Sequence, residues 1–252
     1  KKIRSKSISI NNKNIKYFAP KTVSELKKTI KKYPNFNFLS GGTDLSLIVT
    51  KQKKNLENII YLNSIDELNY IKKKNKYIEV GAITPLIKFE LFIKKYYSDF
   101  NMILKRYGSV QIRNVATMAG NIVTASPIGD SLPLLLSLDA SIVIESFNTK
   151  TILPLKNFFI SYRKTKLKKG QFISSIRIPI FKKNIFKAYK ISKRIDDDIS
   201  SVCASFNLAI VNKKIKNIKI AYGGMAPIPK RAIYCEKMLL NSNFSEDIIL
   251  KA

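Results

Sequence analysis

The sequence predicts an α+β protein in two parts, a larger first part and a smaller second part. Two observations predict this class. Up to about residue 184, short apolar strands alternate with short helices, whereas beyond residue 185 three strands with alternating apolar and polar positions are followed by helices. With 252 residues, 45% of them hydrophobic, the chain is long enough to bury one or two cores.

Capping residues and apolar spacing mark the elements of the first part. Thr22 and Glu25 form a capping box, Leu26 and Ile30 share one face of the helix that follows, and Pro34 ends this helix. The expected strands are at residues 36–39, 58–62, 77–80 and 141–145, with a further strand that ends at 177–179. A short helix is expected after residue 64, and longer helices are expected at 85–96, 98–107 and 130–140.

The second part is expected to be a small antiparallel sheet with helices. Residues 186–191, 201–211 and 215–222 alternate apolar and polar side chains, as half-buried antiparallel strands do. Helices are expected at residues 230–240 and from residue 244 onward. Because the last helix runs to Ala252 and the chain begins with Lys1, we expect a piece of a longer protein. The predicted domains are residues 12–184 and 186–252, the second of them incomplete.

The composition excludes several kinds of site. The chain has no histidine, which excludes catalytic groups with an imidazole base and metal sites that need an imidazole ligand. Its two cysteines, Cys203 and Cys235, cannot alone hold a zinc ion or iron–sulfur cluster that needs four cysteine ligands. No apolar run reaches the ~18 residues of a membrane span, and no signal peptide opens the sequence. We therefore expect a cytoplasmic protein with no metal site and no membrane contact, whose chemistry comes from other groups or a cofactor.

The charge of the chain is +29, from 46 Lys and Arg against 17 Asp and Glu, and such a charge attracts nucleic acid. It is spread evenly, however, because residues 1–126 carry +16 and residues 127–252 carry +13. A nucleic-acid-binding protein would gather Lys and Arg on one face with interleaved aromatic side chains. We therefore favour a solvated, lysine-covered surface and expect no specific nucleic-acid partner.

One long segment departs from this even spread. The 36 residues from Asn114 to Thr149 contain no Lys or Arg. Burial of the segment is one explanation, and a wall that faces a cofactor is the other. The second explanation is our hypothesis, and it requires that lysines be sparser around the cofactor site than elsewhere on the protein.

Two stretches of small and polar residues are suited to contact a ligand through their main chain. Residues 40–44, Ser-Gly-Gly-Thr-Asp, follow a predicted strand, and their N–H groups can converge on an anion such as a phosphate. Residues 111–130 are rich in small side chains, hydroxyls and amides. The alternatives are a turn that binds nothing for the first stretch and an ordinary buried loop for the second.

A third stretch combines basic residues with three consecutive aspartates, Asp196, Asp197 and Asp198. Consecutive side chains on a strand point to opposite faces, so the three carboxylates cannot all reach one metal ion. We interpret residues 193–198 as a charge cluster on a mobile loop, with a solvated turn as the alternative.

The sequence resembles a known family from Tyr17 to about Ala232, and five blocks in the same order carry this resemblance. They are FLSGGTDLSLIVTKQ (38–52), QIRNVATMAGNIVTASPIGDSLPLLLSLDA (111–140), YRKTKLKKGQFISSIRIP (162–179), YKISKRIDDDISSVCASF (189–206) and AYGGMAPIPKRA (221–232). Together they resemble the FAD-binding segment of the molybdenum hydroxylases, most closely that of the bacterial xanthine dehydrogenase small subunit.

This resemblance implies a fold and a function. The fold would be a FAD-binding domain of the vanillyl-alcohol oxidase or PCMH type, made of two α/β subdomains, followed by a domain like the C-terminal one of CO dehydrogenase flavoproteins. The function would be that of the FAD-binding part of a xanthine dehydrogenase, which passes electrons from iron–sulfur clusters through FAD to NAD+. The 2Fe-2S clusters and the molybdenum cofactor would lie on a missing segment or on partners, an iron–sulfur domain and a molybdenum-binding large subunit.

Other functions stay open beside this one. The chain could instead be the flavoprotein subunit of an aldehyde or CO dehydrogenase, which belong to the same family. It could also be a basic nucleic-acid-binding protein, or a flavin domain that has decayed to an assembly scaffold.

The resemblance also implies roles for particular positions. The turn at residues 38–45, which we call the glycine turn, would wrap the FAD diphosphate with main-chain amides. Asp130 would contact the adenosine end. Tyr107 would pack on the flavin nucleotide and Ile173 on the isoalloxazine ring. Lys190 would be the catalytic residue, a cation that stabilises reduced, anionic flavin, and the loop at 193–198 would set the electrostatics for a nicotinamide nucleotide. The predicted FAD-binding residues are Phe38, Leu39, Ser40, Gly41, Gly42, Thr43, Asp44, Leu45, Tyr107, Thr117, Met118, Ala119, Gly120, Asn121, Asp130, Ile173 and Lys190.

One of these positions departs from the family pattern. The family usually has two glycines before the asparagine, whereas this chain has Ala119 and Gly120 before Asn121. A positive φ at Ala119 would cost about 1 kcal/mol or more in strain and weaken FAD binding. An ordinary backbone conformation at this position would cost nothing.

Overall fold

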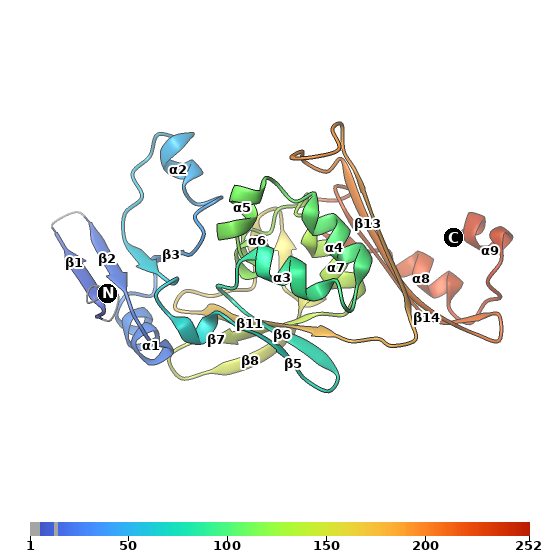
Figure 1. The fold of residues 1–252 in the computed structure, drawn as a ribbon, viewed down its shortest axis with the longest axis horizontal. Coiled ribbons are helices and arrows are strands. Elements are labelled where there is room, and N and C mark those ends of the chain that lie inside the picture. The colour runs from blue at the N-terminus through green and yellow to red at the C-terminus, as the bar shows by residue number, and fades with distance from the viewer. Residues whose placement is uncertain (1–5, 13–14) are drawn as a thin grey trace.

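The computed structural model describes residues 6–12 and 15–252, and it confirms the predicted α+β class. Figure 1 shows a hairpin and a helix at one end, a group of helices over a sheet in the middle, and a sheet of long strands with the last two helices at the other end.

A small sheet with a helix packed on it forms the first subdomain. Its elements are β1 (Ile8–Asn11), β2 (Lys16–Ala19), α1 (Val23–Lys32), β3 (Asn37–Leu39), α2 (Leu47–Thr50) and β4 (Ile59–Tyr61). The strand order is β1-β2-β4-β3, with β4 parallel to both β2 and β3. Leu26 and Ile30 of α1 form one hydrophobic cluster with Ile60 of β4. As predicted, Thr22 caps α1, because its hydroxyl accepts a hydrogen bond from the N–H of Glu25 (3.1 Å).

A five-stranded antiparallel sheet with helices on one face forms the second subdomain (Figure 1). Its strand order is β5-β6-β11-β7-β8, and a short hairpin, β9–β10, lies beside it. The strands are β5 (Ile71–Lys73), β6 (Tyr77–Gly81), β7 (Ser141–Glu145), β8 (Lys150–Pro154), β9 (Phe159–Ser161), β10 (Lys164–Thr165) and β11 (Phe172–Pro179). The helices are α3 (Leu86–Ile93), α4 (Ser98–Lys105), α5 (Val110–Val115), α6 (Met118–Thr124) and α7 (Ser131–Ser137), with 3-10 turns η2 (Asp66–Leu68) and η3 (Leu155–Asn157).

The third unit is the predicted antiparallel sheet at the C-terminal end of the chain. It contains β12 (Ile185–Ile191), β13 (Val202–Val211), β14 (Lys214–Gly223) and β15 (Lys230–Arg231), followed by α8 (Ile233–Leu239) and α9 (Glu246–Lys251). Helices α4 and α7 contact one side of this sheet, and α8 lies on the other side (Figure 1). Across the first contact the buried Asn207 side chain donates to the carbonyl of Ser137 (3.0 Å), which fixes β13 against α7.

The prediction of one helix over residues 230–240 was wrong at its beginning. Residues 230 and 231 form β15 instead, where Ala221 pairs with Arg231. The Arg231 guanidinium donates to Glu236 (2.9 Å) and to Asp139 (3.2 Å), so this residue is held against α8 and the α7–β7 turn. These contacts hold Arg231 in the strand pairing, and the helix begins only at Ile233.

The described part of the chain has neither a membrane-spanning helix nor a cluster of metal ligands. In residues 6–12 and 15–252 there is no helix that could cross a membrane. The same residues contain no group of three His, Cys, Asp or Glu side chains arranged to hold a metal ion.

Candidate functional site

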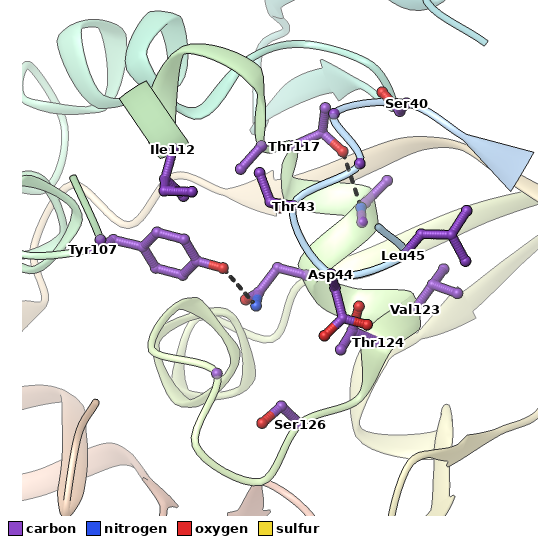
Figure 2. A pocket seen from close by; sticks show the side chains of 18 of the residues that line it. Ser40, Thr43, Asp44, Leu45, Tyr107, Ile112, Thr117, Val123, Thr124 and Ser126 are labelled. Carbon is purple, nitrogen blue, oxygen red and sulfur yellow. Dashed lines mark hydrogen bonds between the residues drawn. The ribbon is translucent and has the colours of Figure 1, made fainter. Parts of the chain in front are cut away.

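A cavity of 720 Å³ lies where the three units meet. Its walls come from the turn between β3 and α2, from the segment that runs from the end of α4 through α6 to the start of α7, from β11, and from the loop between β12 and β13. Figure 2 shows several of the side chains that line it, with Ser40 and Thr43 close to Thr117, the residue that caps α6.

The glycine turn and the segment before α6 touch through their main chains. A Cβ atom placed on Gly41 would lie 2.0 Å from the carbonyl oxygen of Val115 and 3.0 Å from the nitrogen of Ala116, so no side chain fits at this position. Gly42 has φ +71°, a left-handed conformation that glycine adopts without strain. Two turns that are far apart in the sequence therefore meet at one wall of the cavity.

Gly120 is a glycine for a different reason. It lies inside α6 without a positive φ, and a Cβ atom here would meet only the Thr117 hydroxyl within 4 Å, at 3.0 Å. The space beside it is open and belongs to the cavity. The missing side chain thus leaves the main chain of α6 accessible to a ligand.

Ala119, the departure from the family pattern, has an ordinary conformation. It lies in α6, is 7% exposed, and is not among the described residues with a positive φ. The strain considered from the sequence is therefore absent, and alanine suits the helix better than glycine would.

Hydrogen bonds connect Tyr107, Asn121 and Ser131 at the polar part of the cavity wall. Asn121 donates from Nδ2 to the Tyr107 hydroxyl (3.0 Å), and its Oδ1 accepts from Ser131 (2.5 Å). The Tyr107 ring points toward this bond in Figure 2. Burial and the nearby carboxylates of Asp130 and Asp44 raise the pKa of Tyr107 to about 12. The phenol therefore stays protonated at neutral pH and can donate a hydrogen bond.

Lys190 does not line the cavity. Its side chain is 1% exposed, and its ammonium donates to the carboxylate of Asp130 (2.7 Å) and to the carbonyls of Arg106 (2.9 Å) and Asp198 (2.8 Å). All three N–H donors are therefore used inside the protein. Asp130 does line the cavity and also accepts from the Ser200 hydroxyl. The ion pair thus joins β12 to the cavity wall.

The loop between β12 and β13 is tied to the same wall. Arg106 donates to the carbonyl of Ile195 (2.8 Å) and to the Ser192 hydroxyl (3.0 Å). Within the loop, hydrogen bonds from the N–H groups of Arg194 and Ile199, with the Arg194 charge, hold the pKa of Asp198 below its usual value. Asp198 thus organises the loop as a turn, and both Asp197 and Asp198 line the cavity.

The cavity wall has a distinct composition. None of the described residues that line it is a lysine, and its basic side chains are Arg163 and Arg194. The segment without Lys or Arg divides in two, because residues 116–130 contribute to the cavity wall, whereas α7 and β7 are almost wholly buried. The lack of Lys and Arg therefore goes with a cavity wall in residues 116–130 and with burial in α7 and β7.

The structure brings all but two of the predicted residues to the cavity wall. The exceptions are Lys190 and Met118, which is fully buried in the core. The sequence reasoning missed further lining residues. Ile112, Thr124 and Ser126 lie within the stretch of residues 111–130 already noted, whereas Arg163 carried no signal that distinguished it. The residues predicted to bind FAD that line the cavity are Phe38, Leu39, Ser40, Gly41, Gly42, Thr43, Asp44, Leu45, Tyr107, Thr117, Ala119, Gly120, Asn121, Asp130 and Ile173.

Two family models match the chain. Residues 13–181 match "FAD binding domain in molybdopterin dehydrogenase", and residues 187–252 match "CO dehydrogenase flavoprotein C-terminal domain". Among curated proteins, the xanthine dehydrogenase of Emericella nidulans is 30% identical over 97% of this chain, which corresponds to 19% of that protein. The glyceraldehyde dehydrogenase medium chain of Sulfolobus acidocaldarius is 28% identical over 92% of this chain and 83% of its own. The chain thus spans about a fifth of the length of the xanthine dehydrogenases that it matches.

Solved structures share the fold. The carbon monoxide dehydrogenase of Hydrogenophaga pseudoflava aligns with a TM-score of 0.87 and 23% identity, over 95% of this chain and 84% of that one. The quinoline 2-oxidoreductase of Pseudomonas putida 86 aligns with a TM-score of 0.84 and 19% identity, over 95% of this chain and 84% of that one.

Replacing Lys190 tests its place in the structure. Lys190→Met leaves the buried Asp130 carboxylate without its cation, so we expect a loss of about 3–5 kcal/mol in the free energy of unfolding, measured by urea denaturation. Lys187→Met is the matched control, because Lys187 is an exposed lysine on the same strand whose ammonium lies 3.6 Å from the buried Asp99 carboxylate. Asp99 keeps its hydrogen bond from the N–H of Ala188 (3.2 Å) in this variant, so the loss should be smaller than in Lys190→Met. Equal, small losses for both variants would show that the Lys190 ammonium is not a structural cation.

Proposed function

The chain belongs to the family of FAD binding domains in molybdopterin dehydrogenase, and we propose that it is the FAD-binding, electron-transfer part of a xanthine dehydrogenase. One observation carries the proposal for the site: the contact of Gly41 with Val115 and Ala116 brings two main-chain segments to the same cavity.

The residues present fit FAD. The cavity of 720 Å³ has the size of a cofactor site, and Gly120 leaves open space where a Cβ atom would point. The walls combine apolar side chains, Ile173 and Phe172 among them, with hydroxyl and amide groups. Charged side chains also line the cavity, namely Asp44, Asp130, Asp197, Asp198, Arg163 and Arg194. No described lysine lines the cavity, so the long flexible side chains that cover much of the surface do not occupy it.

Each part of the wall has a distinct task in this proposal. Main-chain N–H groups of residues 40–44 and of the first residues of α6 bind the diphosphate, because a dinucleotide's negative charge suits converging amides. Within α6, the N–H groups of Gly120 and Asn121 are already used by the hydroxyl and the carbonyl of Thr117 (3.0 and 3.1 Å), so the donors come from before Gly120. Tyr107 donates its hydroxyl proton to a polar atom of the cofactor, and Ile173 packs on the ring system. FAD, when bound, supplies the redox chemistry, and the protein supplies binding, orientation and exclusion of water.

Lys190 acts through Asp130 in this proposal. Its ammonium neutralises the Asp130 carboxylate and fixes the direction of that side chain, so Asp130 can accept a hydrogen bond from the adenosine end of the cofactor. The loop that contains Asp198 is held by the same ammonium. Lys190 is therefore a positioning residue rather than a cation at the flavin ring.

We further propose that electron transfer through this site runs from iron–sulfur clusters on a partner domain to NAD+, with purine hydroxylation at a molybdenum centre on a large subunit. The xanthine dehydrogenases that match nearly the whole chain support this assignment. The flavoprotein of an aldehyde dehydrogenase is the second candidate, because a glyceraldehyde dehydrogenase medium chain matches over 83% of its own length. The free cysteines Cys203 and Cys235 agree with a reducing, cytoplasmic location.

FAD binding gives the first test. The purified chain, mixed with FAD and freed of excess, should keep the two flavin absorption bands. Gly120→Ala fills the open space beside α6, so the affinity for FAD should fall by about tenfold or more, equivalent to about 1.4 kcal/mol. The new Cβ atom would also lie 3.0 Å from the Thr117 hydroxyl that caps α6, so urea denaturation of the FAD-free variant is the control that separates a filled site from a weakened cap. A wild-type chain without flavin bands, or equal affinities for both proteins, would contradict the proposed site.

The electron acceptor gives the second test. If NAD+ is the physiological acceptor, NADH should reduce the bound flavin in the reverse direction, and the visible flavin band should disappear under anaerobic conditions. Dithionite serves as the control for full reduction. A flavin that dithionite bleaches and NADH does not would favour the second candidate, an enzyme with another acceptor.

A further inference from the structure

Arg163 is a basic residue on the cavity wall that the functions assigned above do not explain. It lies in the turn between β9 and β10 and lines the cavity. The other basic residue of the described wall, Arg194, is 76% exposed and pairs with Asp198 of its own loop. Arg163 pairs instead with Asp44 of the glycine turn, 119 residues away in sequence (Nη2 to Oδ1, 3.3 Å).

The backbone at Arg163 is strained. Its φ is +54°, in the left-handed region that favours glycine. On either side of this turn Lys164 pairs with Ser161, and the register of the hairpin shifts between Lys164 and Thr165. A glycine would form this turn without strain, so the arginine side chain is present despite a conformational cost. Such strain occurs preferentially at binding and active sites.

The ion pair with Asp44 does not by itself account for this cost. The two side chains are 49% and 45% exposed, and an exposed pair of this kind contributes little to stability. Only Nη2 of the guanidinium donates to Asp44, and in the part of the chain that the structure describes its other N–H groups have no acceptor. The guanidinium therefore has unused, charged donors beside the glycine turn.

We propose that Arg163 is an anion-binding residue of this cavity, whose guanidinium is held beside the glycine turn by Asp44 and donates to a diphosphate oxygen of the dinucleotide. This proposal rests on FAD binding at the cavity. The glycine turn supplies neutral main-chain donors, and the ammonium of Lys190 is already used by Asp130. Arg163 is thus the positive charge available to a diphosphate at this end, and charge-assisted bonds from a guanidinium are among the stronger polar contacts.

The test compares Arg163→Gln with Lys164→Gln. Both variants remove one positive charge from the same hairpin, but Lys164 is exposed and does not line the cavity. We expect Arg163→Gln to weaken FAD binding by about 10- to 100-fold at low salt, as loss of a charge-assisted hydrogen bond does. Lys164→Gln should bind as the wild type does. FAD fluorescence quenching gives the affinities, and the ratio between wild type and Arg163→Gln should shrink as salt screens the charge.

Thermal unfolding of the FAD-free proteins distinguishes binding from folding. The proposal requires that Arg163→Gln and the wild type unfold at the same temperature without FAD. Equal FAD affinities, an equal loss in Lys164→Gln, or a loss of stability in the FAD-free variant that accounts for the weaker binding would each overturn it. A wild-type chain that binds no FAD would instead overturn the proposed function.

Discussion

The site depends on the contact between Gly41 and the main chain at Val115 and Ala116. Because a Cβ atom at Gly41 would lie 2.0 Å from the Val115 carbonyl oxygen, the two segments can approach this closely only with a glycine. This contact places the turn after β3, in the first subdomain, against the segment before α6, in the second. The cavity for the dinucleotide exists because these two subdomains are joined at this point.

The third unit contributes to the site through a second interaction. The ion pair between Lys190 of β12 and Asp130 at the start of α7 is almost wholly buried, and breaking one partner of such a pair leaves a charge without compensation. Arg106 holds the loop of the same unit by donating to Ile195 and Ser192. The cavity wall is therefore completed by residues far apart in the sequence. In the function proposed above, a chain without histidine serves a redox enzyme in this way, because its side chains would position a cofactor that carries the chemistry.

Local patterns in the sequence predicted local structure well. The cap at Thr22 and the three alternating strands of the C-terminal sheet are present as expected, because capping and side-chain alternation depend on neighbouring residues. The glycine turn and residues 117–121 meet at one cavity, as the family resemblance implied. What the sequence did not reveal depends on distant partners. Lys190 is 60 residues from Asp130, and Arg163 is 119 residues from Asp44.

Hydrogen–deuterium exchange, measured with and without FAD, tests the central claim most directly. If the two main-chain segments bind one diphosphate, the amides of residues 40–44 and of residues 117–121 should both exchange more slowly when FAD is present. Slower exchange in only one segment, or in neither, would contradict the account that the contact at Gly41 creates a shared binding site.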